Sequence, residues 1–438
     1  MEAPYAVIAD DLTGAGDTGV QFAHAGLRTR ALLGEWDAAA VGGVDVVVLN
    51  TESRALGPAE AYQVVERTAV RLREAGVVPI YKKIDSTMRG NVGAEVEAVM
   101  DVFGLKLAVI CPAFPANRRL VAGGYLLVDG QPVARTAIGR DPVAPVKMSS
   151  IPALLAAQCR RPVRHVGLDT LDQGREALRQ ALEPPAEGAL AVVDAASEAD
   201  LAAMVEALFD EPGVLFVGSA GLAAPLAERL AQRRRVEEAQ AGDRRAPEAQ
   251  PLVVVACGSV NPVTREQLDE LVRSGNVTVL TVDVEAALRG GPAWDGWLQA
   301  AREQIRAAAA RPGQALVVAT PGGREDVEQA QQIGAGLGLE PAAVAGRLAN
   351  ALAETVIQMM DEIDLAGVIA TGGDTARALF ARLGAAGIDL NSEVFPGIPY
   401  GTLTGGSHPG LRVVTKAGGF GPRNALVEAV RYLESLPL

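Results

Sequence analysis

The chain has few of the residue types that mark metal-binding, disulfide-rich or nucleic-acid-binding proteins. It contains three cysteines and three histidines in 438 residues, and Cys111, Cys159 and Cys257 form no CxxC pair. A zinc site or a disulfide framework needs a denser set of such side chains, so we expect neither. The formal net charge of -13 argues against a protein that binds nucleic-acid phosphates through a broad basic surface.

Long apolar segments and aromatic side chains are also scarce. No uncharged stretch approaches the roughly 20 residues that cross a bilayer, and the N-terminus lacks the positive start and apolar run of a secretory signal. We therefore expect a cytoplasmic protein with no membrane partner. Aromatic residues make up 4% of the chain, whereas glycine occurs 48 times. This balance suits an α/β protein with many turns better than an aromatic-rich β-sandwich.

Short runs of branched apolar residues alternate with helical patterns along the chain, which predicts mainly parallel sheets. An Asp129-Gly130 turn also predicts a β-hairpin. We expect strands at residues 5–9, 44–49, 77–84, 107–111, 125–128, 131–133, 189–193 and 214–217, and again at 252–257, 277–282, 315–319, 368–370 and 412–415. The clearest helical patterns cover residues 92–103, 262–273, 295–310, 344–362, 375–383 and 422–435.

A charged segment divides the chain. Residues 231–251 are nearly free of large apolar side chains, which is typical of a linker between domains. A solvated helix within a single domain is the alternative. We predict two α/β domains, at residues 1–232 and 252–438, joined by a linker at 233–251. A cleft between two such domains is a common place for a substrate site.

Acidic residues follow the first predicted strand in the run AVIADDLTGAGDTG. Asp10 and Asp11 lie at the end of the strand, and Asp17 follows within eight residues. Because ligands bind outside the carboxyl ends of strands in parallel α/β sheets, these carboxylates are candidates to orient substrate hydroxyls, hold a cation or act as a general base. A helix cap would need only one of them, so three acids favour a functional site.

The same run contains a GxGxxG pattern from Gly14 to Gly19, in a turn expected to lead into a helix. This is the spacing of a dinucleotide-binding loop. Asp10, Asp11 and Asp17 would repel a diphosphate there, so we interpret the pattern as a coincidence. An NAD-dependent oxidoreductase that uses this loop stays as an alternative.

The third predicted strand ends in a loop crowded with charged and polar side chains. Arginine offers a planar fork for a carboxylate, lysine offers a compact positive charge, and serine or asparagine can bond hydroxyls. Such a set suits a small polyhydroxylated anion, whereas solvated basic residues and an asparagine helix cap are the alternative. The loop residues are Lys82, Lys83, Asp85, Ser86, Arg89 and Asn91, and the loop after the next strand adds Asn117 and Arg118.

Three glycine turns in the second half each join a strand to a helix. The chain has no GxxxxGK[ST] motif, so a P-loop is not expected. Backbone amides in such turns can still bind phosphate, and a lysine adds positive charge. The candidate nucleotide-binding residues are Ser259 in the first turn, Gly372, Gly373, Asp374 and Thr375 in the second, and Lys416, Gly418 and Gly419 in the third.

Taken together, the motifs resemble those of the four-carbon acid sugar kinases. The matching runs are IADDLTGAGDTG, KKIDSTMRGN, CPAFPANRR, VGSAGLA, CGSVNP, ATGGDTA and KAGGFG, spread from the first strand to the last turn. The resemblance implies an N-terminal sugar-acid-binding domain, a C-terminal nucleotide-binding domain, and ATP-dependent phosphorylation of the terminal hydroxyl of a four-carbon acid. Residues 137–146 look more like threonate or erythronate members than 3-oxo-tetronate members.

The resemblance also implies roles for individual residues. It places Asp10, Asp11, Lys83, Asp85, Ser86 and Arg89 around the acid, and it places Ser259, Gly372, Gly373, Asp374, Thr375 and Gly418 on ATP. We hypothesise that an arginine–lysine pair, Arg89 with Lys82 or Lys83, grips the substrate carboxylate. Asp10 or Asp11 would accept the proton of the attacking hydroxyl, and Mg²⁺ would bridge the ATP phosphates.

Several points stay open at this level. The sequence names no metal ligands, does not say which of the two adjacent aspartates is the base, and leaves a homodimer open. A non-catalytic sugar-acid-binding protein is an alternative function, as is a kinase of the same fold that acts on a different small hydroxy acid.

Overall fold

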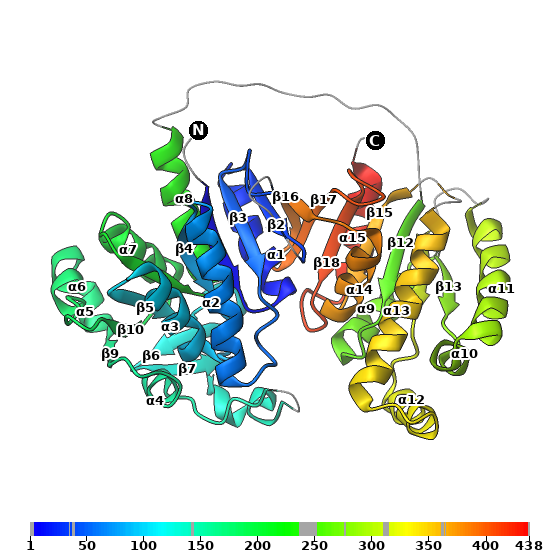
Figure 1. The fold of residues 1–438 in the computed structure, drawn as a ribbon, viewed down its shortest axis with the longest axis horizontal. Coiled ribbons are helices and arrows are strands. Elements are labelled where there is room, and N and C mark those ends of the chain that lie inside the picture. The colour runs from blue at the N-terminus through cyan, green and yellow to red at the C-terminus, as the bar shows by residue number, and fades with distance from the viewer. Residues whose placement is uncertain are drawn as a thin grey trace. The chain divides into compact units, whose positions relative to one another are not determined.

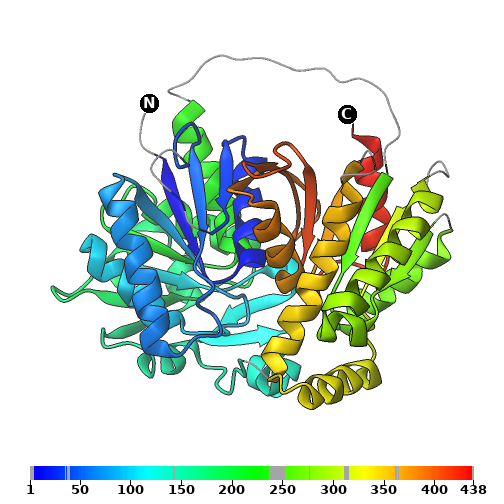
Figure 2. The same cartoon turned by 45° about the vertical axis from the view of Figure 1, so that its right-hand side comes forward.

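The computed structural model describes residues 4–34, 36, 40–141, 144–235, 252–275, 277–309, 315–360, 363 and 365–436. The chain divides into two compact units, Met1–Gln240 and Ala241–Leu438, and each has its own sheet and helices (Figures 1 and 2). Most of the linker predicted at residues 233–251 lies outside the described residues.

The N-terminal unit is built around a parallel sheet with the strand order β2-β3-β1-β4-β11-β5-β10-β9. Its inner strands are apolar and buried at nearly every position, as expected for a sheet covered on both faces. The strands are β1 (Tyr5–Ala9), β2 (Thr29–Leu32), β3 (Val46–Asn50), β4 (Val78–Lys83), β5 (Leu107–Cys111), β9 (Val163–Val166), β10 (Ala189–Val193) and β11 (Val214–Gly218).

Helices cover both faces of this sheet. Helices α2 and α3 pack together on one face, and α1, α8 and α7 pack side by side on the other (Figure 1). The helices are α1 (Leu12–His24), α2 (Pro58–Glu74), α3 (Val92–Phe103), α4 (Ile151–Ala156), α5 (Leu168–Asp172), α6 (Arg175–Ala181), α7 (Glu198–Leu208) and α8 (Ala220–Arg235).

A small antiparallel sheet in the same unit contains the predicted Asp-Gly hairpin. Its order is β6-β7-β8, with β6 (Arg119–Ala122), β7 (Tyr125–Val128) and β8 (Gln131–Pro132). Asp194 anchors the turn between β6 and β7, because its buried carboxylate accepts the amides of Gly123 and Gly124 at 2.7 and 2.9 Å.

The C-terminal unit has a mixed sheet in the order β13-β14-β12-β15-β18-β17-β16. The first five strands are parallel, and β16 and β17 form an antiparallel hairpin whose second strand pairs with β18. The strands are β12 (Leu252–Cys257), β13 (Val277–Thr281), β14 (Ala315–Ala319), β15 (Leu365–Thr371), β16 (Gly387–Phe395), β17 (Ile398–Thr404) and β18 (Arg412–Lys416).

Two groups of helices pack in this unit. Helices α9 and α15 contact each other, whereas α13 contacts α10, α11, α12 and α14. The helices are α9 (Pro262–Arg273), α10 (Val284–Arg289), α11 (Gly291–Ala309), α12 (Arg324–Gly336), α13 (Pro341–Met360), α14 (Gly373–Leu383) and α15 (Ala425–Ser435). No helix in the described part of the chain is long and apolar enough to cross a membrane.

The fold class predicted from the sequence is confirmed, since both units are α/β with mainly parallel strands. Helices α11, α13 and α14 begin four, three and two residues before their predicted starts, at Gly291, Pro341 and Gly373. Helix α15 instead begins at Ala425, three residues after the predicted start at Pro422. Residues 423 and 424 form a turn, across which the amide of Ala425 donates to the carbonyl of Pro422 at 2.9 Å.

Candidate functional site

The carboxyl ends of three neighbouring strands bring the predicted acid-binding residues together. Strands β3, β1 and β4 lie side by side in that order. Asp10 and Asp11 follow β1, and Asp85 and Arg89 follow β4. Arg54, which sequence analysis did not select, follows β3 and lies between the two groups. We call Asp10, Asp11, Lys83, Asp85, Arg89 and Arg54 the acid cluster.

Arg54 joins both aspartates. Its Nε and Nη2 donate to the carboxylate of Asp10 at 2.8 and 2.9 Å, and its Nη1 and Nη2 donate to that of Asp11 at 2.8 and 2.6 Å. Paired arginine–carboxylate bonds fix geometry as well as charge. Asp11 stays the more accessible of the two, since its side chain is 22% exposed and that of Asp10 is 3% exposed.

The charges around Asp10 and Arg54 keep both groups ionised. Burial would raise the pKa of Asp10, but Arg54 and then Lys82 and Lys83 lower it below its ordinary value. Burial would likewise lower the pKa of Arg54, but the neighbouring carboxylates raise it well above its ordinary value. An opposite charge a few ångströms away favours the charged form. Asp10 is therefore an ionised carboxylate at neutral pH.

The loop after β4 carries a second ion pair. Arg89 donates through Nε and Nη2 to the two carboxylate oxygens of Asp85, each at 2.9 Å. Burial would raise the pKa of Asp85, but Arg89 and Arg54 hold it well below its ordinary range. Met88, in the same loop, is buried with a left-handed φ of 64°. Bulky residues seldom adopt this conformation, and such strain is concentrated in functional loops.

Asn91 holds the segment that carries Arg54. Its Nδ2 donates to the carbonyls of Leu56 at 2.8 Å and Ser53 at 3.4 Å, and the side chain makes no helix-capping bond. Gly90 adds a close approach, since a Cβ there would lie 3.2 Å from Arg54 Cγ. Asn91 therefore supports the acid cluster through Arg54.

The two lysines of β4 have different surroundings. Lys82 is fully buried, and its Nζ lies 2.7 Å from Glu95 Oε2 on α3. This counts against the hypothesis that Lys82 grips the acid, because its ammonium is fully buried, whereas the Arg89 side chain is 32% exposed. Lys83 lies beside the start of α1, where a Cβ on Gly14 would come within 2.4 Å of its Nζ. Lys83 is the lysine that remains for an acid ligand.

The other predicted acid-site residues are less closely tied to the cluster. Ser86 is partly exposed within the loop after β4. Asn117 lies in a short 3₁₀ turn after β5, and among the described residues its side chain makes no hydrogen bond to the acid cluster. Arg118 is 75% exposed and pairs with Asp129 at the hairpin turn, at 3.1 Å. An exposed pair of this kind contributes little energy.

The glycines after the first strand lie inside helix α1 and not in a turn, so that expectation was wrong. Helix α1 begins at Leu12, and the Asp11 carboxylate caps it by accepting the amide of Gly14 at 2.9 Å. Asp17 is buried within the helix. Amides beyond the first helical turn bond to carbonyls four residues earlier, so Gly16 and Gly19 cannot offer free N–H groups to a diphosphate.

The three glycine turns of the C-terminal unit also come together, at the carboxyl ends of the neighbouring strands β12, β15 and β18. A Cβ on Gly258 would lie 2.2 Å from Thr375 Oγ1, and one on Gly418 would lie 2.7 Å from Ser259 Oγ. Gly372 has a φ of 96°, and its amide bonds to the last carbonyl of β18 at 2.8 Å. Only glycine fits approaches this close.

Two charged residues predicted for the nucleotide have opposite environments. Lys416 is 2% exposed, and its Nζ donates to the carbonyl of Ala417 at 2.9 Å. Burial lowers the pKa of Lys416 to about 8. Asp374 has a side chain that is 73% exposed and pairs with Arg377 at 2.7 Å. Two predicted nucleotide-binding residues remain. Gly373 is the first residue of α14, and Gly419 lies in the turn after β18.

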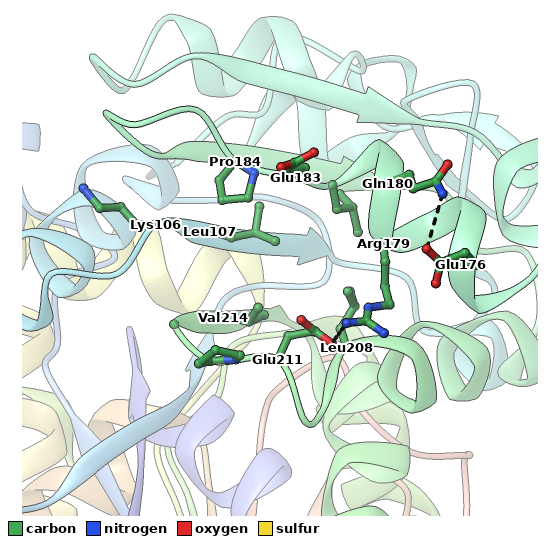
Figure 3. Close-up of a pocket in the computed structure, with 13 residues that line it drawn as sticks. Lys106, Leu107, Glu176, Arg179, Gln180, Glu183, Pro184, Leu208, Glu211 and Val214 are labelled. Carbon is green, nitrogen blue, oxygen red and sulfur yellow. Dashed lines mark hydrogen bonds and ion pairs between the residues drawn. The ribbon is translucent and has the colours of Figure 1, made fainter.

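A cavity of about 330 Å³ in the N-terminal unit lies away from these loops (Figure 3). Leu107 and Val214, the first residues of β5 and β11, line it. It is therefore at the amino ends of parallel strands, opposite the edge that carries the acid cluster. Arg179 and Glu211 form an ion pair on its wall at 2.5 Å. None of the predicted site residues lines this cavity.

Comparison with known proteins identifies the class as two-domain proteins that combine sugar and nucleotide binding. A sugar-binding N-terminal domain matches residues 5–226, and a nucleotide-binding C-terminal domain matches residues 254–426. A D-threonate kinase of Bordetella bronchiseptica is 38% identical, covering 99% of this chain and 98% of the relative. A D-erythronate kinase of Heliobacterium modesticaldum is 32% identical, covering 98% and 96%. The chain belongs to the four-carbon acid sugar kinase family, as its motifs indicated.

A solved structure supports the fold assignment. A Salmonella typhimurium protein provisionally described as a tRNA synthase is 26% identical to this chain. It superimposes with a TM-score of 0.79, covering 98% of this chain and all of the other.

Proposed function

We propose that the chain transfers a phosphoryl group from ATP to the terminal hydroxyl of a four-carbon sugar acid, D-threonate or D-erythronate. The observation that carries the proposal is the acid cluster, in which Arg54 holds Asp10 and Asp11 together at the edge of a sugar-binding domain. The names of the two kinase relatives support the substrate class, and the nucleotide-binding domain supports ATP.

The acid cluster contains the groups that the first substrate needs. Phosphoryl transfer depends more on positioning and charge than on covalent chemistry by the protein. Asp11 is the carboxylate that a substrate hydroxyl can reach, so it orients this hydroxyl and accepts its proton. Lys83 and Arg89 bind the substrate carboxylate. The cluster balances three carboxylates, Asp10, Asp11 and Asp85, against the three cations Arg54, Arg89 and Lys83.

The glycine turns around Ser259, Gly372 and Gly418 hold ATP in this proposal. Mg²⁺, when bound, neutralises charge on the ATP phosphates, and it needs only one or two carboxylates from the protein. Asp374 is an exposed carboxylate at the start of α14 and fits such a role. In the described part of the chain, no group of three or more His, Cys, Asp or Glu side chains could form a site built from protein alone.

A coupled assay of ADP formation tests the proposal. With Mg²⁺ and ATP present, D-threonate or D-erythronate should stimulate ADP release well above the rate without acid, and a 3-oxo-tetronate should stimulate it less. Mass spectrometry of the product should show one added phosphoryl group. ATP consumption that no four-carbon acid stimulates would contradict the proposal.

The cytoplasmic location and the homodimer considered from the sequence both remain predictions.

A further inference from the structure

The turn after β18 has an unusual arrangement of backbone carbonyls. Residues 417–422 connect β18 to the segment before α15 and include Gly418 and Gly419. Side chains from α9 and from the end of β18 reach the carbonyl side of this turn. We call Thr264, Gln267 and Lys416 the collar residues.

Thr264 and Lys416 act on the first part of the turn. Thr264 Oγ1 donates to the carbonyl of Gly418 at 2.7 Å. Lys416 Nζ donates to the carbonyls of Ala417 and Gly418 at 2.9 and 3.3 Å, and to Thr264 Oγ1 at 3.3 Å. Thr264 is fully buried and Lys416 nearly so. Buried donors that converge on one turn fix its conformation, because leaving them unpaired would be costly.

Gln267 acts on the second part of the turn. It is fully buried, and its Nε2 donates to three consecutive carbonyls, those of Phe420, Gly421 and Pro422, at 2.9 to 3.0 Å. Its Oε1 has no hydrogen-bond partner among the described residues. The Gln267 side chain therefore contacts the turn only as a hydrogen-bond donor.

The direction of the carbonyls determines the direction of the amides. In a planar trans peptide the C=O and the next N–H point to opposite sides. Because the carbonyls of Ala417 and Gly418 point at the collar, the N–H groups of Gly418 and Gly419 point away from it. Neither amide donates to another described residue, and Gly419 is exposed. Successive outward amides are a common way to bind an anion.

We propose that Thr264, Gln267 and Lys416 are positioning residues that hold the turn with its carbonyls inward, so that the Gly418 and Gly419 amides bind a phosphate of the nucleotide. This rests on the proposed ATP site and replaces the prediction that Lys416 contacts phosphate directly. Lys416 acts through the turn, because its ammonium donates to the carbonyls of that turn.

Substitutions at Thr264 test the collar. Thr264→Val removes the hydroxyl at nearly constant shape, and Thr264→Ser keeps it. The KM for ATP of the full chain should rise about tenfold in Thr264→Val, as expected from the loss of about one buried hydrogen bond, and should stay within about twofold in Thr264→Ser. The KM for the acid should not change in either variant.

Thr355→Val is a matched control. Thr355 is also buried, and its hydroxyl donates to the carbonyl of Ala351 at 2.8 Å within α13. The control loses the same kind of bond and should lose similar stability, but its KM for ATP should match that of the parent. An unchanged KM in Thr264→Val, or an equal rise in Thr355→Val, would overturn the inference.

Hydrogen exchange provides a test that needs no variant. Without nucleotide, a peptide covering residues 417–421 should exchange quickly, and saturating MgATP should protect it. Absence of this protection in a parent chain that binds ATP would refute the inference and leave the proposed function intact. A parent that binds no ATP by calorimetry would refute the proposed function. In that case the role of the collar residues would be tested by calorimetry with inorganic triphosphate in place of ATP. Absence of binding of this ion as well would refute the inference about the collar residues.

Discussion

Asp10 and Asp11 are adjacent in the sequence but differ in what they can do. Asp10 is almost fully buried and receives two bonds from Arg54, so it fixes the guanidinium. Asp11 shares the same guanidinium but also caps α1 and keeps contact with solvent. The structure thus distinguishes a buried aspartate from one that solvent reaches, which the sequence alone could not do.

Asp11→Asn should separate catalysis from binding. The amide keeps the shape and an oxygen to cap α1, but it cannot accept a proton. We expect kcat to fall by about 10² to 10⁴, the usual contribution of a general base. The Kd for ATP, measured by calorimetry, should stay within about twofold of the parent. Unchanged turnover would show that Asp11 is not the base.

Lys416 predicts an unusual dependence of stability on pH. Burial lowers its pKa from 10.5 to about 8, so between these values the unfolded chain binds more protons than the folded chain. The free energy of unfolding should therefore rise with pH across this interval. The electrostatic influence of Cys257 opposes this shift of the Lys416 pKa.

The contribution of Lys416 can be isolated by comparison with Lys416→Met. From about pH 7 to about pH 10 the parent should gain about 2 kcal/mol of stability relative to the variant. Urea unfolding at several pH values measures this difference. A difference that does not depend on pH would mean that Lys416 titrates near its ordinary pKa.

At the scale of elements, the side chain of Asn91 shapes the acid cluster by holding the segment that carries Arg54. Asn91 lies just before α3 and holds the segment of residues 53–56 by two carbonyls. Asn91→Ala should raise the KM for the acid about tenfold, because Arg54 loses its fixed position. The free energy of unfolding should fall by about 1 kcal/mol for the lost bonds.

Gln158→Ala is the control for this variant. The Gln158 amide also bonds backbone groups near the start of α3, those of Gly93 and Gly90 at 2.9 and 3.1 Å. It does not bond the Arg54 segment. Because Gln158 reaches Arg54 only indirectly, through Gly90, its removal should raise the KM for the acid less than Asn91→Ala does at a similar loss of stability. Equal rises in this KM, measured by steady-state kinetics, would mean that Asn91 has no specific role at the acid cluster.

The sequence predicts correctly those helices and strands whose bounds are set by a local pattern of residues. The strand LVVVAC at Leu252–Cys257 and the helix at Pro262–Arg273 have the predicted bounds, because a fully apolar run and an Asn-Pro helix start are unambiguous. Strands β2 and β9 were not predicted, since TRAL and VRHV are short and contain charges. Pairing with a neighbouring strand, which is a tertiary effect, makes them strands.

The candidate site shows the same limit. Asp10, Asp85 and Arg89 could be predicted because charged residues stand out at the end of a buried strand. Arg54 could not be selected with the same ease, because its role depends on β3 lying next to β1. The only sequence signal for Arg54 was the run of polar residues that follows β3. This run points to the acid cluster only when the order of the strands in the sheet is known.

At the scale of the whole molecule, the two units should respond differently to acid. Asp10 and Asp85 in the N-terminal unit have pKa values below the ordinary 3.8. Their ion pairs stabilise the fold above that pH, and this stability is lost as the pH falls below it. In the C-terminal unit, burial raises the pKa of the Glu434 carboxyl above its ordinary value, so this group contributes more stability as the pH falls.

Hydrogen exchange after a pH pulse measures this difference. Between about pH 5 and about pH 3, peptides of the N-terminal unit should lose protection before those of the C-terminal unit. Asp85→Asn should bring the pH values at which the two units lose protection closer together, since it removes one acid-sensitive ion pair from the N-terminal unit. Simultaneous loss of protection in both units would contradict the prediction.

The acid cluster contains equal numbers of positive and negative groups, and this balance affects the release of the product at the end of the proposed reaction. A phosphorylated acid leaves with two more negative charges than the acid that entered. A surrounding with surplus cations would retain such a trianion and suffer strong product inhibition. The acid cluster offers no such surplus, so in the proposed reaction we expect the phosphorylated acid to leave without being held by unpaired positive charge.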